Sequence, residues 1–105
     1  MILVIDTTKF GKVEFSLEYQ RRKIKQSFPV RPQESDKILN FLDDFLKASK
    51  VFHLKSDIKK IVIYKGQGSF IGLRIAAAIA QALSFAWSVP LTIQTKIDEK
   101  RIKTF

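Results

Sequence analysis

The chain has 105 residues, enough for one domain with a modest hydrophobic core. Its 46% hydrophobic and 28% charged residues are ordinary for a globular protein, and the absence of cysteine excludes disulfides, thiolate nucleophiles and zinc–thiolate sites. The formal net charge of +9 has two readings. It indicates an anionic partner, such as RNA or an acidic protein surface, or it reflects only a solvated, lysine-rich surface.

The first part of the sequence predicts three strands. Residues 2–5 form a short apolar run, which is typical of a central strand covered on both faces. Residues 12–19 alternate between apolar and polar side chains, so we expect one buried face and one polar face. Residues 20–22 then predict a hairpin turn, and the lysine-rich residues 23–28 predict an edge strand.

Two helices and two further strands follow. Apolar residues at helical spacing predict a helix over residues 34–49, after Pro29 and Pro32. The β-branched residues 61–63, followed by Tyr64, predict a strand over residues 61–64. A second helix is predicted over residues 69–87, where only a narrow stripe is polar, and a last strand over residues 91–94.

This order of elements predicts an α/β fold. The helix between the hairpin and strand 61–64 makes a crossover, which places that strand parallel to the first one. A five-stranded mixed sheet in the order 3-2-1-4-5 follows, with two main helices, as in the ribonuclease-H-like fold. We expect a single domain over residues 1–95 and a charged C-terminal tail over residues 96–105.

Few residues carry recognisable chemistry, and we expect no catalytic or metal-binding residue. Asp6 follows the first strand, but strand 61–64 supplies no carboxylate, which argues against the two-metal site of a polynucleotide-cutting enzyme. The single histidine, His53, is more typical of a loop residue than of a metal ligand.

One phosphate-binding site is nevertheless conceivable. The glycine-rich turn 66–69 joins a strand to a helix and directs backbone N–H groups to one point above the helix N-terminus. The candidate residues are Asp6, Thr7, Thr8, Gly66, Gly68 and Ser69. The alternative is structural: Asp6 ties down the hairpin, and the glycines let the helix lie close to the sheet. Because there is one lobe to hold a nucleotide, we expect no cofactor for this chain alone, and ATP with magnesium only together with a partner.

The second predicted helix has more apolar surface than one sheet contact requires. Gly72, Ala76 and Ala80 recur every four residues, a spacing that lets another helix approach closely. The sequence therefore predicts a protein–protein interface built from both helices. Its predicted residues are Ile38, Leu42, Phe45, Gly72, Ile75, Ala76, Ile79, Ala80 and Leu83.

The glycine turn and the helix after it resemble a known family. Gly66, Gly68, Ser69, Phe70, Gly72, Leu73 and Arg74 match the run Gly-Pro-Gly-Ser-Phe-Thr-Gly-Leu/Val-Arg that is typical of the TsaB (YeaZ) family, with Gln67 and Ile71 as departures. The opening residues MILVIDTT also resemble that family. The resemblance covers about residues 1–95, the N-terminal lobe of such proteins, and the sequence shows no counterpart of their second lobe.

The resemblance implies an actin-like ATPase lobe that does not catalyse. It implies a cytoplasmic scaffold or activator in the synthesis of tRNA threonylcarbamoyladenosine, bound through its two helices to a TsaD-like transferase, with a TsaE-like ATPase as third component. Without that partner, the same helices would form a homodimer. Contact with tRNA is expected to be indirect or weak, and polar residues between 71 and 93 argue against a membrane span. The alternatives are a small basic RNA-binding module and a residual nucleotide-binding half-site.

Overall fold

The computed structural model of the chain describes residues 1–9, 11–49, 57–65 and 71–95. The strands are β1 (Ile2–Asp6), β2 (Lys12–Tyr19), β3 (Arg22–Pro29), β4 (Lys60–Lys65) and β5 (Leu91–Thr95). The helices are the 3₁₀ helix η1 (Pro32–Lys37) and the α-helices α1 (Ile38–Ala48) and α3 (Ile71–Trp87). The predicted tail over residues 96–105, His53 and the glycine turn 66–69 lie outside the described residues.

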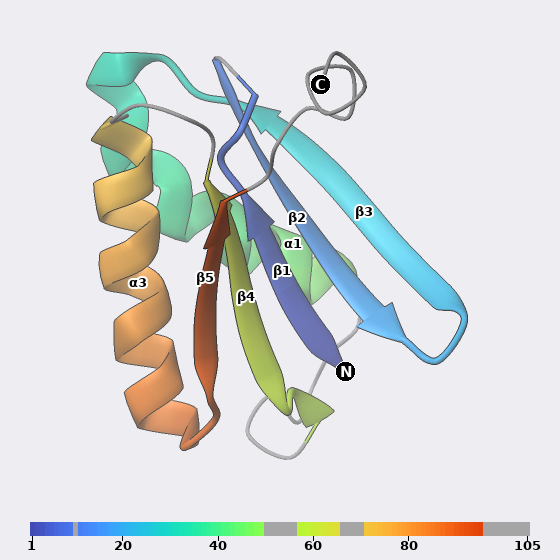
Figure 1. Ribbon diagram of the computed structural model, residues 1–105. Helices are drawn as coiled ribbons and strands as arrows, with labels where there is room; N and C mark the ends of the chain where they lie inside the picture. The colour runs from blue at the N-terminus through green and yellow to red at the C-terminus, as the bar shows by residue number, and fades with distance from the viewer. Residues whose placement is uncertain (10, 50–56, 66–70, 96–105) are drawn as a thin grey trace, which may run out of the picture.

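The strands form one five-stranded sheet in the order β3-β2-β1-β4-β5, which confirms the predicted order (Figure 1). β1 pairs with β2 and β2 with β3 in antiparallel fashion, whereas β4 lies parallel to both β1 and β5. In the centre, Ile5 lies between Phe15 of β2 and Ile63 of β4. This register places alternate residues of three neighbouring strands on the same face.

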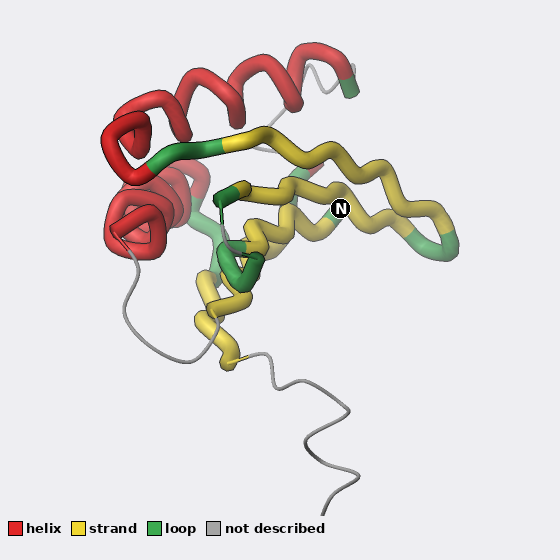
Figure 2. Tube along the Cα trace, turned by 90° about the horizontal axis from the view of Figure 1, so that it is seen from above, coloured by secondary structure: helices red, strands yellow, loops and turns green. Residues whose placement is uncertain are grey.

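Both helices pack on one face of the sheet. Figure 2, seen from above, shows the helices together on one side of the strands. α1 contacts β2, α3 contacts β4 and β5, and the two helices contact each other. The core lies between these layers and contains Leu3, Ile5, Val13, Phe15, Leu17, Ile38, Leu42, Phe45, Leu46, Ile61, Ile63, Ala76 and Ala80.

Aromatic side chains join β2 and β3 to α1. The ring centroid of Phe15 lies 5.7 Å from that of Phe28 and 5.8 Å from that of Phe45. Phe28 in turn stacks on Phe41, with centroids 4.9 Å apart. Fully burying a phenylalanine ring contributes about 1.5–3 kcal/mol, and Phe15 and Phe45 are fully buried, so this cluster is a main reason why α1 lies against β2.

The segment before α1 differs from the single helix predicted over residues 34–49. Residues up to Lys37 form η1, and the α-helix begins only at Ile38. Glu34 makes ion pairs with Arg31 and Lys37, three residues away on either side. Side chains three residues apart eclipse one another in a 3₁₀ helix, so these pairs favour the tighter turn. The α-helix starts where apolar residues can reach the core.

α3 ends in a Schellman motif. Ser88 has a φ of +54°, in the left-handed region. Its N–H donates to the carbonyl of Phe85 at 3.3 Å, and the N–H of Val89 donates to the carbonyl of Ser84 at 3.1 Å. These two bonds satisfy carbonyls that the helix end leaves open, and they turn the chain towards β5.

The face of the sheet away from the helices is more buried than its polar sequence predicts. No helix in the described residues covers it, yet Glu14 and Ser16 are buried there together with Val4 and Val62. The alternation of residues 12–19 is confirmed, but Glu14 and Ser16 on its polar face are buried as well. Side chains from neighbouring strands and loops enclose these positions, and local alternation cannot reveal such neighbours.

Candidate functional site

The first candidate site lies where β1 ends beside β4. Asp6 is only 5% exposed, and its backbone pairs with that of Tyr64. Thr7 donates hydrogen bonds from its N–H and its hydroxyl to the Tyr64 carbonyl, at 3.0 and 3.1 Å. The predicted glycine turn follows β4 directly in the chain. Both halves of the predicted phosphate site therefore follow the carboxyl ends of two adjacent parallel strands, where α/β sheets commonly bind ligands.

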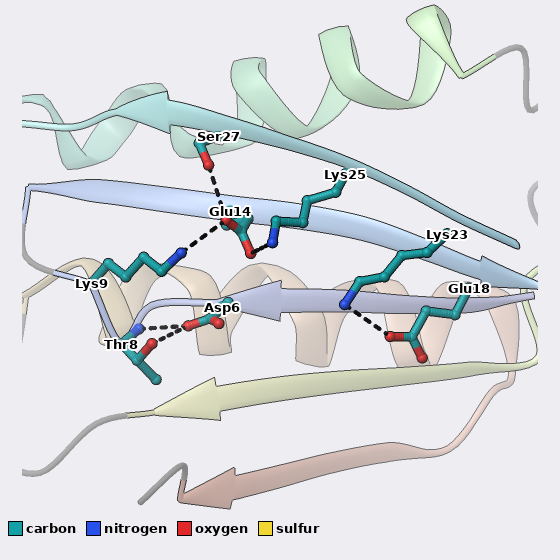
Figure 3. Close-up of polar contacts among 8 residues, drawn as sticks. All are labelled: Asp6, Thr8, Lys9, Glu14, Glu18, Lys23, Lys25 and Ser27. Atoms are coloured by element: carbon teal, nitrogen blue, oxygen red, sulfur yellow. Dashed lines mark hydrogen bonds and ion pairs between the residues drawn. The ribbon is translucent and has the colours of Figure 1, made fainter. Parts of the chain in front are cut away.

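The side chain of Asp6 is engaged in holding the β1–β2 loop. The N–H of Thr8 donates to Asp6 Oδ1 at 2.8 Å, and the Thr8 hydroxyl donates to the same oxygen (Figure 3). Such a local carboxylate-to-backbone bond fixes the direction in which the chain leaves the strand. This geometry fits the structural alternative, in which Asp6 ties down the hairpin.

Phosphate binding by these residues stays a prediction. Asp6, Thr7 and Thr8 are consecutive residues at the end of β1, and Gly66, Gly68 and Ser69 lie outside the described residues. Within the described part of the chain, no group of three or more histidine, cysteine, aspartate or glutamate side chains is arranged to hold a metal ion.

A second polar cluster, which the sequence did not single out, surrounds Glu14. Its carboxylate accepts a hydrogen bond from the Ser27 hydroxyl at 3.0 Å and pairs with Lys9 at 3.4 Å and Lys25 at 3.5 Å (Figure 3). Burial raises the pKa of Glu14, but the Ser27 and Lys9 hydrogen bonds and the nearby lysine charges outweigh it, so the pKa lies below its ordinary value. The cluster joins the β1–β2 loop to β2 and β3, which makes it a stabilising contact.

The predicted interface residues do not share one environment. Ile38, Leu42, Phe45, Ala76 and Ala80 are buried in the chain's own core, which corrects their assignment to a partner-facing surface. Ile75, Ile79 and Leu83 are half-buried and pack against that core, and Gly72 lies in the first turn of α3. The physical reason is that α1 and α3 each turn their most regular apolar stripe towards the sheet.

Other residues of the same helices are exposed. Phe85 is 89% exposed, and Ala78, Ala82 and Ala86 of α3 are exposed as well. Their spacing of three to four residues places them on one side of the helix, called here the outer face of α3. α1 also exposes an apolar side chain, Leu39, at 53%. Ala78 and Ala82 are offset by two positions from Ala76 and Ala80, but α3 is apolar on nearly every side, so its sequence does not separate exposed residues from core residues.

No helix in the described residues is long and apolar enough to cross a membrane.

Sequence comparison decides the family. The family model described as TsaD, tRNA N6-adenosine threonylcarbamoyltransferase, matches residues 30–94, well over half of the chain. The chain belongs to this family. The match includes α1, β4, α3 and β5, and it stops just before the end of β5.

Within the TsaD family, the chain is similar to TsaB proteins. It is 33% identical over 92 residues to the tRNA threonylcarbamoyladenosine biosynthesis protein TsaB of Buchnera aphidicola subsp. Baizongia pistaciae. The alignment covers 88% of this chain and 40% of that relative, so the chain spans less than half of its length. The resemblance to the N-terminal lobe of TsaB is thereby confirmed.

Solved structures support the same fold. YeaZ from Pseudomonas aeruginosa superposes with a TM-score of 0.74 over 90% of this chain and 43% of its own, at 24% identity. A second structure, described as an uncharacterized protein with similarity to peptidase YeaZ from Pseudomonas aeruginosa, gives the same score and identity over 90% of this chain and 42% of its own. These likenesses confirm the ribonuclease-H-like and actin-like α/β fold.

Proposed function

We propose that this TsaD-family chain is an accessory subunit in the formation of threonylcarbamoyladenosine in tRNA. The name of its curated TsaB relative and the description of its family support this role. In the proposal the chain acts as a scaffold or activator and does not catalyse the transfer. The two hydrogen bonds from Thr8 to Asp6 favour a non-catalytic role, because they use this carboxylate to hold the β1–β2 loop.

The observation that carries the proposal is the outer face of α3. Leaving a phenylalanine side chain such as Phe85 in water forgoes about 1.5–3 kcal/mol of burial free energy. Around it, Ala78, Ala82 and Ala86 present small side chains that would let a second helix approach closely. An exposed aromatic anchor among small residues has the chemistry of a binding hot spot.

The partner we propose is a TsaD-like transferase. The matched family model includes both helices of this chain, so a TsaD-like subunit is expected to carry a lobe of the same kind. Two similar lobes can pair about a pseudo-twofold axis, each using the same helices. The same geometry would produce a homodimer when the partner is absent. A TsaE-like ATPase, ATP with magnesium supplied by the assembly, and a cytoplasmic location stay predictions.

Sedimentation velocity with a purified TsaD-like subunit tests the interface. Phe85→Glu should weaken the complex by at least about 2 kcal/mol, roughly 30-fold in Kd, because the charge would be buried in an apolar contact. Ile24→Glu is the matched control, since Ile24 is an exposed apolar residue that lies on β3 and not on α3. Both variants should keep the circular dichroism of the wild type.

The experiment distinguishes a wrong partner from a wrong interface. If wild-type protein forms no complex with the TsaD-like subunit at micromolar concentration, the proposed partner is wrong. If the complex forms and Phe85→Glu binds as tightly as Ile24→Glu, the partner stands and the outer face of α3 is not the interface.

A further inference from the structure

Among the described residues, the net positive charge is concentrated in one part of the fold. Residues 9–31 contain seven lysines and arginines but only two glutamates, whereas the other described residues contain six cations and six anions. The whole net charge of the described residues, +5, therefore belongs to the segment that forms the β2–β3 hairpin and its two flanks. Within the described part of the chain, the net charge is therefore not spread evenly over the surface.

The hairpin presents these charges at its tip and along the edge of the sheet. Arg21 and Arg22 are exposed and make no ion pair within the described part of the chain. Lys23 and Lys25 are paired with Glu18 and Glu14, each at 3.5 Å, but both lysine side chains remain about half exposed. Exposed ion pairs contribute little to stability, so a phosphate group can replace Glu18 or Glu14 or share these lysines with them.

An exposed aromatic ring completes this surface. Tyr19 is 54% exposed and pairs across the hairpin with Arg22, so both residues lie on the same face of the sheet. The sequence did not indicate this pairing, because the two residues meet only through the register of the turn. Lys23 and Lys25 pair with Glu18 and Ser16, so their side chains lie on the opposite face of the hairpin from Tyr19 and Arg22. We define the hairpin surface as the tip and both faces of this hairpin, with Tyr19, Arg21, Arg22, Lys23 and Lys25.

We propose that the hairpin surface binds the phosphate backbone of RNA directly. Arginine forks match phosphate groups well, and an exposed tyrosine can stack on an unpaired base. An acidic protein surface would be attracted by the same charges, but it would gain nothing from a stacking ring. The choice of tRNA as the RNA rests on the function proposed above.

The hairpin surface is separate from the surface proposed for the protein partner. In Figure 1 the β2–β3 turn lies at the opposite edge of the sheet from α3. The outer side of α1, by contrast, carries the exposed carboxylates Asp43 and Asp44, which would repel RNA. One chain can therefore hold a TsaD-like subunit at its helices and a tRNA at its hairpin at the same time.

Fluorescence anisotropy with an unmodified tRNA transcript, from 50 to 200 mM salt, tests the proposal. The double variant Arg21→Ala/Arg22→Ala should raise Kd on the order of tenfold and reduce the slope of log K against log salt by about 1.5. The matched control is Lys47→Ala/Lys59→Ala, which removes the same charge from exposed positions outside the hairpin. The control should leave both Kd and the salt slope close to those of the wild type.

A Tyr19→Ala variant and a competition with polyglutamate show whether the ligand is RNA or an acidic protein. Tyr19→Ala should weaken tRNA binding several-fold and leave binding to polyglutamate unchanged. The proposal is overturned if wild-type protein does not bind tRNA at 50 mM salt, if both double variants lose affinity equally, or if polyglutamate competes as well as tRNA at equal charge.

The same variants keep the two proposals distinguishable. Phe85→Glu should bind tRNA normally, and Arg21→Ala/Arg22→Ala should bind the TsaD-like subunit normally. Loss of tRNA binding in the hairpin variant alone supports the RNA surface even if no TsaD complex forms. A normal TsaD complex without tRNA affinity for the chain overturns only the RNA surface.

Discussion

Thr8 donates two hydrogen bonds, one from its N–H and one from its hydroxyl, to a single carboxylate oxygen of Asp6. Bonds to a charged acceptor contribute about 1.5–3 kcal/mol, and removing the acceptor also leaves two partly buried donors of Thr8 without this partner. We therefore expect Asp6→Ala to lower the free energy of unfolding by about 2 kcal/mol, measured by urea denaturation. Asp6→Asn keeps an acceptor oxygen, so its free energy of unfolding should fall by less than that of Asp6→Ala.

The exposed residue Asp36 provides the control for Asp6, and Asp36→Ala should change stability by no more than about 0.5 kcal/mol. If Asp6→Ala were as stable as wild type but lost a measurable affinity for ATP, the carboxylate would serve a ligand and not the fold.

The Glu14 cluster should give the protein a pH-dependent contribution to stability. The folded pKa of Glu14 lies below its ordinary value of 4.5, so the unfolded chain binds the proton more readily. The contribution is complete above about pH 4.5 and is lost as the pH falls through the folded pKa. Glu14→Gln should be about 1 kcal/mol less stable than wild type at pH 7, and this difference should shrink below pH 4.5.

Urea denaturation at pH 7, 5, 4 and 3 measures that difference. Ser27→Ala removes one hydrogen bond to Glu14 and keeps both lysines, so it should retain part of the pH dependence. A difference between wild type and Glu14→Gln that stayed constant from pH 7 to pH 3 would contradict the assignment.

Glycine at position 88, at the end of α3, should make the protein more stable than the native serine does. Ser88 occupies the left-handed position of the Schellman motif, which costs a residue with a Cβ about 1–2 kcal/mol. Glycine avoids this cost but loses more entropy on folding, so Ser88→Gly should stabilise the protein by about 0.5–1 kcal/mol. Ala86→Gly, two residues earlier inside the helix, should destabilise it by about 1 kcal/mol in the same thermal unfolding assay. If both glycine substitutions changed the stability in the same direction, Ser88 would not occupy the left-handed position of a Schellman motif.

The two sides of α3 should respond oppositely to an added side chain. Ala80 is fully buried against the sheet, so Ala80→Leu should overpack the core and cost about 1–3 kcal/mol. Ala82 is exposed, and Ala82→Leu should change the free energy of unfolding by less than about 0.5 kcal/mol. Urea denaturation of both variants decides which side faces the core. If Ala80→Leu were as stable as the wild type, the Ala80 side of α3 would not face the core.

Much of the fold follows from patterns within short stretches of sequence. The alternation of Val13, Phe15 and Leu17 predicts which side of β2 enters the core, because side chains of a strand alternate between faces. The sheet order is predictable because a crossover helix between parallel strands is almost always right-handed. The family resemblance, too, was readable from the glycine turn and the helix that follows it.

The candidate surfaces were decided by contacts between distant parts of the chain. α3 is apolar on nearly every side, so its sequence does not reveal that Ala76 and Ala80 face the sheet while Phe85 faces solvent. In the same way, Glu14 is buried because Ser27 and Lys25 of β3 lie beside it in the folded sheet. The sequence by itself determined the elements, their order and the family, because periodicity, turn chemistry and chirality act locally. Only the tertiary structure decided which side of each element is covered, because burial depends on what packs against it from elsewhere in the chain.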